Sequence, residues 1–322
     1  MDISVTVKFW VLPLLRIAVP IFFMITGLFY DRIYDAEKAG KQIKKIAIFA
    51  LVANLLHVAW EISKLLLNGD SITIYFKEVI KPTSLIELFC FNQPVWRTSI
   101  WYINALLYVL ILVYILQKRN KQNVKKLYPL IPFLLIGNFV LGTYAPVLFG
   151  ESVSLFYSRN FLLCGLPYFL IGNYLSNHIF RIKNKLLFLL ISTFYFVTLL
   201  EQKLLFHFDL LFHCDLFIGT TLLAVTIFLL FMQNENWFNN KICVTLAGYG
   251  KNYSFIIYIV HSIIIEMFSK VISMCGSYTE LLENIFRWCG PIVVLICSTF
   301  VAAVWVMINK NIKQLRTSKN SI

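Results

Sequence analysis

Two histidines stand inside long apolar stretches of this sequence, where an ionisable side chain costs at least ~2.5 kcal/mol to insert into a membrane. His57 lies four residues before Glu61, a spacing that places both side chains on one face of a helix. His261 is followed by Ser262 and then by Glu266, a candidate hydrogen-bond partner. Imidazole and carboxylate groups commonly act as general acids and bases. The candidate catalytic residues are therefore His261, His57 and Glu61, with a structural hydrogen-bonded role as the alternative for each.

A second set of polar and aromatic residues lies near one end of the apolar stretches. An arginine there can bind an anionic or hydroxyl-rich ligand, or it can extend to the membrane interface and contact a lipid phosphate. Aromatic residues at this level also form the usual interfacial belt. The candidate substrate-binding residues are Arg16, Trp101, Tyr102, Arg159, Asn160, Glu201 and Asp215. Because the opposite halves of the stretches are mostly apolar, we expect a cavity that opens toward the polar side.

The composition of the chain is that of an integral membrane protein. Of the 322 residues, 59% are hydrophobic and 14% are charged, whereas about a quarter are charged in an ordinary soluble domain. A helix needs roughly 20 mostly apolar residues to cross the bilayer, and such stretches recur along the chain. The predicted helices span residues 9–30, 46–66, 100–117, 127–149, 160–180, 186–200, 210–232, 253–273 and 287–308. We therefore predict an all-α fold, a single polytopic bundle of about nine helices over residues 1–322.

The formal net charge of +13 has an explanation that does not involve nucleic acid. Most of the 29 Lys and Arg residues fall in alternate short loops, such as 32–45, 118–126 and 181–185. Cytoplasmic loops of membrane proteins carry this excess of basic residues. The pattern predicts a protein of the plasma membrane with an outside N-terminus and a cytoplasmic C-terminus. It also predicts contact with membrane lipid and no nucleic-acid partner.

The cysteines and the familiar catalytic motifs give little further information. The seven cysteines lack the paired spacing of a metal site, so no metal is expected. Cys275 and Cys289 flank a predicted outer segment, where a disulfide could join them. No Walker loop, zinc-protease motif, nucleophile elbow or glycine-rich dinucleotide motif occurs. The common chemistries of soluble enzymes are therefore unsupported.

Four segments in order resemble the acyltransferase 3 family of membrane-bound acyltransferases, which modify sugars and other components of the cell envelope. They are RIAVPIFFMITG at 16–27, IWYINALLY at 100–108, RNFLLCGLPYFLIG at 159–172, and GKNYS at 250–254 with IYIVH at 257–261. The resemblance implies transfer of an acyl group, commonly acetyl, from acyl-CoA as donor co-substrate. The acceptor would be a hydroxyl of a cell-surface glycan or lipid-linked sugar.

Family members usually have one core helix more than the nine predicted here, placed before them, and both ends in the cytoplasm. That first helix carries an arginine and a histidine regarded as catalytic, and this chain begins after the corresponding position. The resemblance therefore implies that the start of the sequence is set too late, that the gene is truncated, or that the protein is a non-catalytic relative. In the chain as it stands, His261 or His57 would have to replace that histidine.

Two other functions stay open from the sequence. A transporter-like module for a small metabolite such as an amino acid would also need a central polar cavity and broken helices. Residues that could supply such breaks are Pro13, Pro20, Pro132, Pro146 and Pro167. A structural membrane subunit without a ligand is the third possibility.

Overall fold

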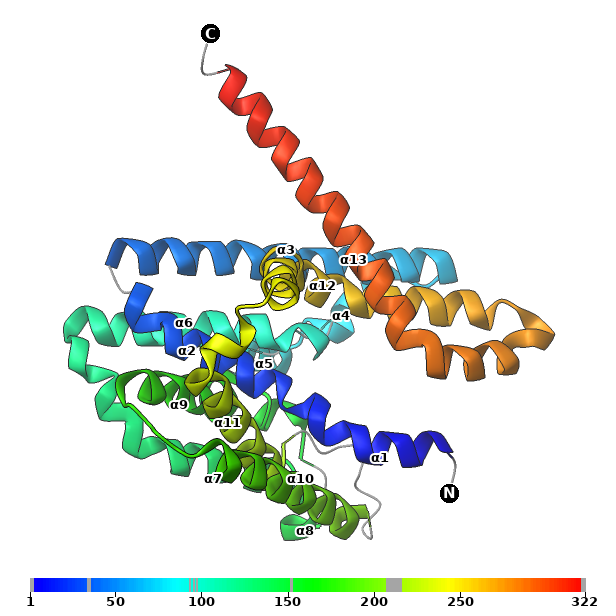
Figure 1. The fold of residues 1–322 in the computed structure, drawn as a ribbon. Coiled ribbons are helices and arrows are strands. Elements are labelled where there is room, and N and C mark those ends of the chain that lie inside the picture. The colour runs from blue at the N-terminus through cyan, green and yellow to red at the C-terminus, as the bar shows by residue number, and fades with distance from the viewer. Residues whose placement is uncertain are drawn as a thin grey trace. The chain divides into compact units, whose positions relative to one another are not determined.

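The computed structural model describes residues 3–33, 36–92, 94, 96, 98–150, 153–206 and 216–319. Within these residues the chain is helical and forms no strand, as Figure 1 shows. It divides into two compact units. The first unit is Met1–Leu55 with Leu65–Glu235, and the second is Leu56–Lys64 with Asn236–Ile322.

Six helical spans within the described residues are long and apolar enough to cross a membrane. They are Phe9–Asp31, Lys38–Asn68, Trp101–Arg119, Asn184–Leu205, Lys241–Ser273 and Thr279–Asn311. The helix Ile218–Gln233 is also apolar but has only 16 residues. The predicted all-α membrane bundle is thus confirmed, whereas the predicted number of nine helices is not.

The first unit holds most of the helices. They are α1 (Ile3–Arg16), α2 (Ala18–Ile33), the greater part of α3 (Ala36–Asn68), α4 (Ile72–Val79), α5 (Pro82–Phe91), α6 (Trp101–Arg119), α7 (Ile131–Leu141), α8 (Ala145–Phe149), α9 (Leu166–Asn177), α10 (Asn184–Phe206) and α11 (Ile218–Gln233). Short 3₁₀ helices are η1 (Thr98–Ile100), η2 (Lys121–Asn123), η3 (Lys125–Leu130) and η4 (Leu155–Tyr157), and η5 (Phe161–Gly165) is a π-helix.

The predicted helix at residues 9–30 is interrupted in the structure. Helix α1 ends at Arg16 and α2 begins at Ala18, with a turn at Ile17. Pro20 lacks the N–H that would bond to the carbonyl of Arg16, so the helical ladder is broken at that point. The break places Arg16 at a helix end.

The predicted helices at 127–149 and 160–180 are also divided. The first becomes η3, α7 and α8, with prolines near the N-termini of α7 and α8 and Gly142 between these two helices. A Cβ on Gly142 would lie 2.6 Å from the Asn138 carbonyl oxygen and 2.8 Å from the Ser158 Cβ, so the chain passes too closely for a larger residue. The second becomes the π-helix η5 followed by α9, which has Pro167 in its first turn.

Helices α2 and α9 form the most tightly packed pair in the first unit. A Cβ on Gly27 would lie 2.0 Å from the Phe169 carbonyl oxygen, and one on Gly172 would lie 2.0 Å from the Met24 carbonyl oxygen. Lipid is as apolar as the side chains, so close backbone approach and van der Waals contact drive such pairing. The Tyr168 hydroxyl adds a hydrogen bond of 2.6 Å to Thr221 of α11.

The second unit contains helix α12 (Lys241–Ser273), helix α13 (Thr279–Lys319), the short 3₁₀ helices η6 (Glu235–Phe238) and η7 (Gly276–Tyr278), and one segment of α3. Figure 1 shows α12 and α13 paired and joined by a short turn. Both helices begin before the predicted ranges 253–273 and 287–308. Asn240 accepts a hydrogen bond of 2.9 Å from the Cys243 N–H and caps α12 there. Cys275 and Cys289 are free thiols, so the predicted disulfide does not form.

Candidate functional site

A cavity of about 220 Å³ in the first unit gathers three of the predicted site residues. It is lined by Leu15, Arg16, Val19, Ser99, Trp101, Asn138, Ser158, Arg159, Cys164 and Leu216, and we call it the arginine cavity. Arg16, Trp101 and Arg159 were expected at a binding site, and the fold brings them together from distant parts of the chain. Among the described residues, the lining holds two guanidinium groups and no carboxylate.

Each arginine is positioned by a local break in helical structure. Arg16 is the last residue of α1, directly before the turn at Ile17. Arg159 follows η4, and its backbone N–H donates to the Leu155 carbonyl at 2.7 Å. Trp101 is the first residue of α6. All three residues therefore lie at or next to the end of a helix, where no further helical turn separates the side chain from a ligand.

The inner wall of the arginine cavity is built from buried polar residues that the sequence analysis did not select. Asn138 of α7 is 2% exposed, and its side-chain amide donates to the Ser158 carbonyl at 2.6 Å. Cys164 of η5 is 1% exposed. An asparagine within the apolar stretch 131–141 was a detectable signal. The π-helix that presents Cys164 had no sequence signal we could have read.

Asn160 is adjacent to Arg159 but does not line the cavity. Its Oδ1 accepts from the N–H groups of Leu162 and Leu163 at 2.9 and 2.8 Å, and its Nδ2 donates to the carbonyls of Phe156 and Tyr157. The side chain caps η5 and fixes the turn that carries Arg159. The structure thus gives Asn160 a positioning role.

Asn92 supports the same turn from another element. It closes α5 in a left-handed conformation with φ of 55°, which asparagine tolerates better than most residues. Its Oδ1 accepts from the Phe161 N–H at 2.7 Å. Asn92 is fully buried and was not selected from the sequence.

Tyr102 and Glu201 also lie outside the lining of the arginine cavity. The Tyr102 ring packs against Phe23, with centroids 4.9 Å apart. Glu201 of α10 accepts from the backbone N–H groups of Ile218 and Gly219 at 3.2 and 2.8 Å. Glu201 also accepts from the Tyr144 hydroxyl. These contacts cap α11 and favour a negative charge at the N-terminus of that helix.

Asp215 lies outside the described residues.

In the second unit, His57 and Glu61 bond to different groups. His57 is fully buried, and its Nε2 lies 3.0 Å from the Ile259 carbonyl oxygen of α12. Because a carbonyl only accepts, Nε2 carries the proton in this contact. Glu61 forms an ion pair of 2.8 Å with Lys64. These two contacts link His57 to α12 and Glu61 to Lys64.

Lys64 joins two carboxylates. It also lies 3.1 Å from Glu266 of α12, and the Trp60 indole N–H donates to the same Glu266 oxygen at 2.7 Å. Glu266, the expected partner of His261, is thus engaged by Lys64 and Trp60. This cluster ties the α3 segment to α12.

The His261 ring is held by a hydrogen bond to its own helix. Its Nδ1 lies 2.7 Å from the Tyr258 carbonyl oxygen, one turn earlier in α12. This contact places the proton on Nδ1 and leaves Nε2 as the basic nitrogen of the neutral ring. The side chain is half-buried. Of the two intramembrane histidines, His261 has the geometry that suits proton transfer.

The described residues contain no group of three or more His, Cys, Asp or Glu side chains that could hold a metal ion. The arginine cavity can supply electrostatic chemistry through the side chains of Arg16 and Arg159. Two guanidinium groups in a site of low dielectric can bind an anion or stabilise an oxyanion that develops during acyl transfer. The volume fits a small acyl group, because pockets for larger ligands measure roughly 300–1,000 Å³.

Comparison with models of known protein families identifies the family of this chain. A model of the acyltransferase 3 family, described as an acyltransferase domain, matches residues 2–308. This chain belongs to that family. Comparisons with curated proteins and with solved structures gave no match. The acyltransferase 3 match spans nearly the whole chain and includes residues of both units, so the protein is a multi-pass membrane acyltransferase. The match does not favour the transporter alternative.

Proposed function

We propose that this acyltransferase moves an acetyl group from acetyl-CoA to a hydroxyl of a cell-surface glycan or lipid-linked sugar, and that the two arginines of the arginine cavity contribute to the transfer. The observation that carries the proposal is the convergence of Arg16 and Arg159 on one small cavity in a member of the acyltransferase 3 family. A guanidinium that stabilises the tetrahedral oxyanion would lower the barrier to acyl transfer. The cavity volume supports a short acyl chain over a long one.

The reaction needs one base and one leaving group. The base takes the hydroxyl proton as the oxygen attacks the thioester carbonyl, and the C–O bond forms. The oxyanion then collapses, the C–S bond breaks, and CoA leaves as a thiol after protonation. His261 is the proposed base, because its Nδ1 is anchored and its Nε2 is basic. His57 is the second candidate, and Glu61 is proposed to act only through its ion pair with Lys64.

The basic loops support a location in the plasma membrane with a cytoplasmic C-terminus. In that orientation the arginine cavity lies toward the outer side, where a glycan acceptor would be found. Trp101 in the lining would stack on the sugar face, as aromatic rings do against apolar ring faces.

The test measures acetyl transfer by purified protein in lipid nanodiscs, with radiolabelled acetyl-CoA and a lipid-linked sugar acceptor. In parallel, O-acetyl groups on surface glycans are quantified by mass spectrometry in a deletion strain that carries each variant. The variants are Arg16→Gln and Arg159→Gln. The matched control is Arg119→Gln, an exposed arginine at the end of α6 that does not line the cavity.

We expect each cavity variant to reduce transfer by about 100-fold, the effect of removing one oxyanion donor. The control should retain the activity of the unmodified protein. Equal activity in all three variants would exclude the arginine cavity as the site of transfer. Uptake of a small metabolite without any transfer would overturn the enzymatic proposal and restore the transporter alternative.

A further inference from the structure

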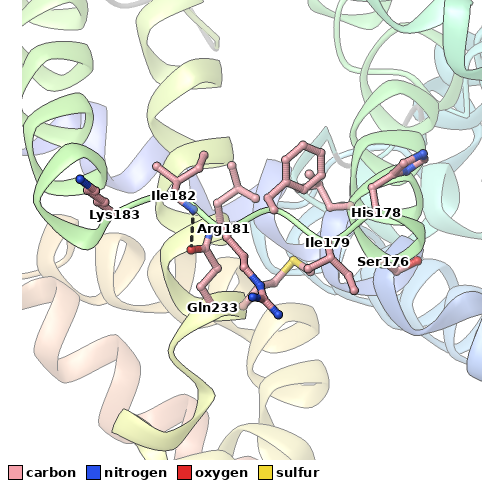
Figure 2. A pocket seen from close by; sticks show the side chains of 11 residues that line it. Ser176, His178, Ile179, Arg181, Ile182, Lys183 and Gln233 are labelled. Carbon is pink, nitrogen blue, oxygen red and sulfur yellow. Dashed lines mark hydrogen bonds between the residues drawn. The ribbon is translucent and has the colours of Figure 1, made fainter.

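A second and larger cavity lies at the other end of α9, and none of its lining residues lines the arginine cavity. Its volume is about 560 Å³, and it is formed by the end of α9, the loop 178–183 and the end of α11. Figure 2 shows its lining residues. We call it the loop cavity. Its volume is within the range of pockets that hold a ligand of substantial size and exceeds what a free inorganic anion needs.

The lining of the loop cavity is apolar on one side and cationic on the other. Leu175, Leu229 and Met232 provide apolar surface from α9 and α11. Arg181 and Lys183 provide positive charge, and no carboxylate from the described part of the chain lines the cavity. A ligand that fits this lining has an apolar part and an anionic part.

Gln233 offers a hydrogen-bond donor that has no acceptor in the described part of the chain. Its Oε1 accepts from the Ile182 N–H at 3.2 Å, the bond drawn in Figure 2. This contact fixes the orientation of the amide and identifies the other atom as Nε2. Nε2 is shielded from solvent and has no hydrogen-bond partner among the described residues. A shielded donor without an acceptor is destabilising, and a bound anion would remove that penalty.

Arg181 is the cation best placed to complete an anion site. No carboxylate in the described part of the chain forms an ion pair with it. In Figure 2 its side chain extends into the middle of the lining residues, whereas Lys183 ends at the margin. A planar guanidinium matches phosphate oxygens with two parallel hydrogen bonds.

His178 is at the edge of the loop cavity and is already engaged. Its ring stacks on Tyr174, with centroids 4.1 Å apart, and its Nδ1 lies 2.8 Å from the Tyr174 carbonyl oxygen. Its Nδ1 is therefore engaged as a donor to its own helix. Arg181 and Gln233 remain the donors available to an anion.

We propose that the loop cavity binds the phosphate of an amphiphilic ligand, with Arg181 and the Gln233 amide as its donors and the apolar wall against the rest of the ligand. Two sources have this chemistry: the headgroup of an anionic phospholipid and the phosphates of a CoA nucleotide. Only the nucleotide source rests on the proposed function. The loop 178–183 is one of the basic loops assigned to the cytoplasmic side, where both ligands occur.

The test uses the full chain and two variants of the donors. Arg181→Gln removes the guanidinium. Gln233→Glu keeps an oxygen that accepts from Ile182 and replaces the free amide by an oxygen that repels phosphate. The matched control is Lys185→Gln, which removes one positive charge in α10 just outside the lining.

Two probes distinguish the sources. CoA binding is measured by calorimetry on protein in nanodiscs of phosphatidylcholine alone. Retention of phosphatidylglycerol is measured by native mass spectrometry after exchange from mixed vesicles. We expect both donor variants to bind one of these two ligands more weakly than the unmodified protein does. The affinity should fall by about tenfold or more, which is the effect of losing one charge-assisted hydrogen bond. The Lys185→Gln protein should bind as the unmodified protein does.

Weakened CoA binding would support the site with a nucleotide ligand, and weakened lipid retention would support it with a phospholipid. The proposal would be overturned if the donor variants bound both ligands as tightly as the unmodified protein does. It would also be overturned if none of these proteins bound either ligand. CoA binding is measured without a transfer step. If the unmodified protein binds CoA but transfers no acetyl group, that result would therefore count against the proposed function alone.

Discussion

The Glu201 side chain on α10 accepts a hydrogen bond of 2.8 Å from the backbone N–H of Gly219, at the start of α11. The two residues fit each other closely. A Cβ on Gly219 would lie 2.9 Å from the Glu201 Oε2 and 2.5 Å from the Thr198 Oγ1. The carboxylate therefore occupies space that exists because residue 219 has no side chain.

Replacement of Glu201 by alanine should lower the stability of the protein. The N–H groups of Ile218 and Gly219 and the Tyr144 hydroxyl would lose their acceptor. Loss of an acceptor for shielded donors costs about 1–3 kcal/mol. We expect a clear fall in the thermal unfolding midpoint in detergent, followed by circular dichroism. The exposed Glu78 of α4 is the control, and Glu78→Ala should change stability by less than about 0.5 kcal/mol. An unchanged midpoint for Glu201→Ala would contradict the capping role.

Glu201 and Asn160 show where sequence reasoning reached its limit. Both are polar residues near the ends of apolar stretches, and from the sequence such residues could bind a ligand or cap a helix. The distinction depends on the spatial neighbours. Glu201 caps α11, which lies within the predicted range 210–232 except for its last residue but begins only at Ile218. Asn160 caps the N-terminus of a π-helix, which periodicity could not locate.

The parts of the fold that depend on the apolar character of the sequence could be predicted. The apolar composition indicated an all-α membrane protein, and the apolar stretches placed α3, α6 and α10 approximately. Arg16, Trp101 and Arg159 were selected separately and meet at one cavity. Pro20, which breaks the helix near Ile17, was among the five prolines named as possible breaks, but the sequence did not show which of them would act. The break at Gly142 was not predicted, because a glycine in an apolar stretch is compatible with a continuous helix.

Replacement of Gly172 by alanine should separate the closest helix pair. The new Cβ would lie 2.0 Å from the Met24 carbonyl oxygen, a backbone atom that cannot move aside alone. Overpacking of this kind costs about 1–3 kcal/mol or more. Unfolding in detergent and the yield of folded protein would measure the loss. The control is Gly40→Ala in α3, because a Cβ at Gly40 meets nothing within 4 Å. Alanine there should be neutral or stabilise the helix by up to about 1 kcal/mol. Equal effects of the two substitutions would contradict the close α2 and α9 contact.

The two intramembrane histidines should respond differently to substitution. His261→Ala should reduce acetyl transfer by about 10²- to 10⁴-fold with little change in unfolding, because its Nε2 is the proposed base. His57→Ala should lower stability by about 1–3 kcal/mol, because a fully buried donor to the Ile259 carbonyl is lost. His57→Gln keeps an N–H donor and should retain more of that stability. Loss of transfer by His57→Gln together with full activity of His261→Ala would reverse the assignment of the base.

The ion pairs of Lys64 with Glu61 and Glu266 should appear as an energetic coupling between the charges. In the unmodified protein the Lys64 Nζ lies 2.8 Å from a Glu61 oxygen and 3.1 Å from a Glu266 oxygen. Lys64→Met removes this shared cation and leaves the two carboxylates near each other. The side chains of Lys64 and Glu61 are 33% and 13% exposed, so screening limits the loss to about 1 kcal/mol. Adding Glu61→Gln removes one of the stranded charges, and the double variant should be more stable than Lys64→Met alone. A double-mutant cycle from unfolding midpoints measures the coupling, and we expect at least about 0.5 kcal/mol. Additive effects of the two substitutions would show that the cluster does not stabilise the contact between α3 and α12.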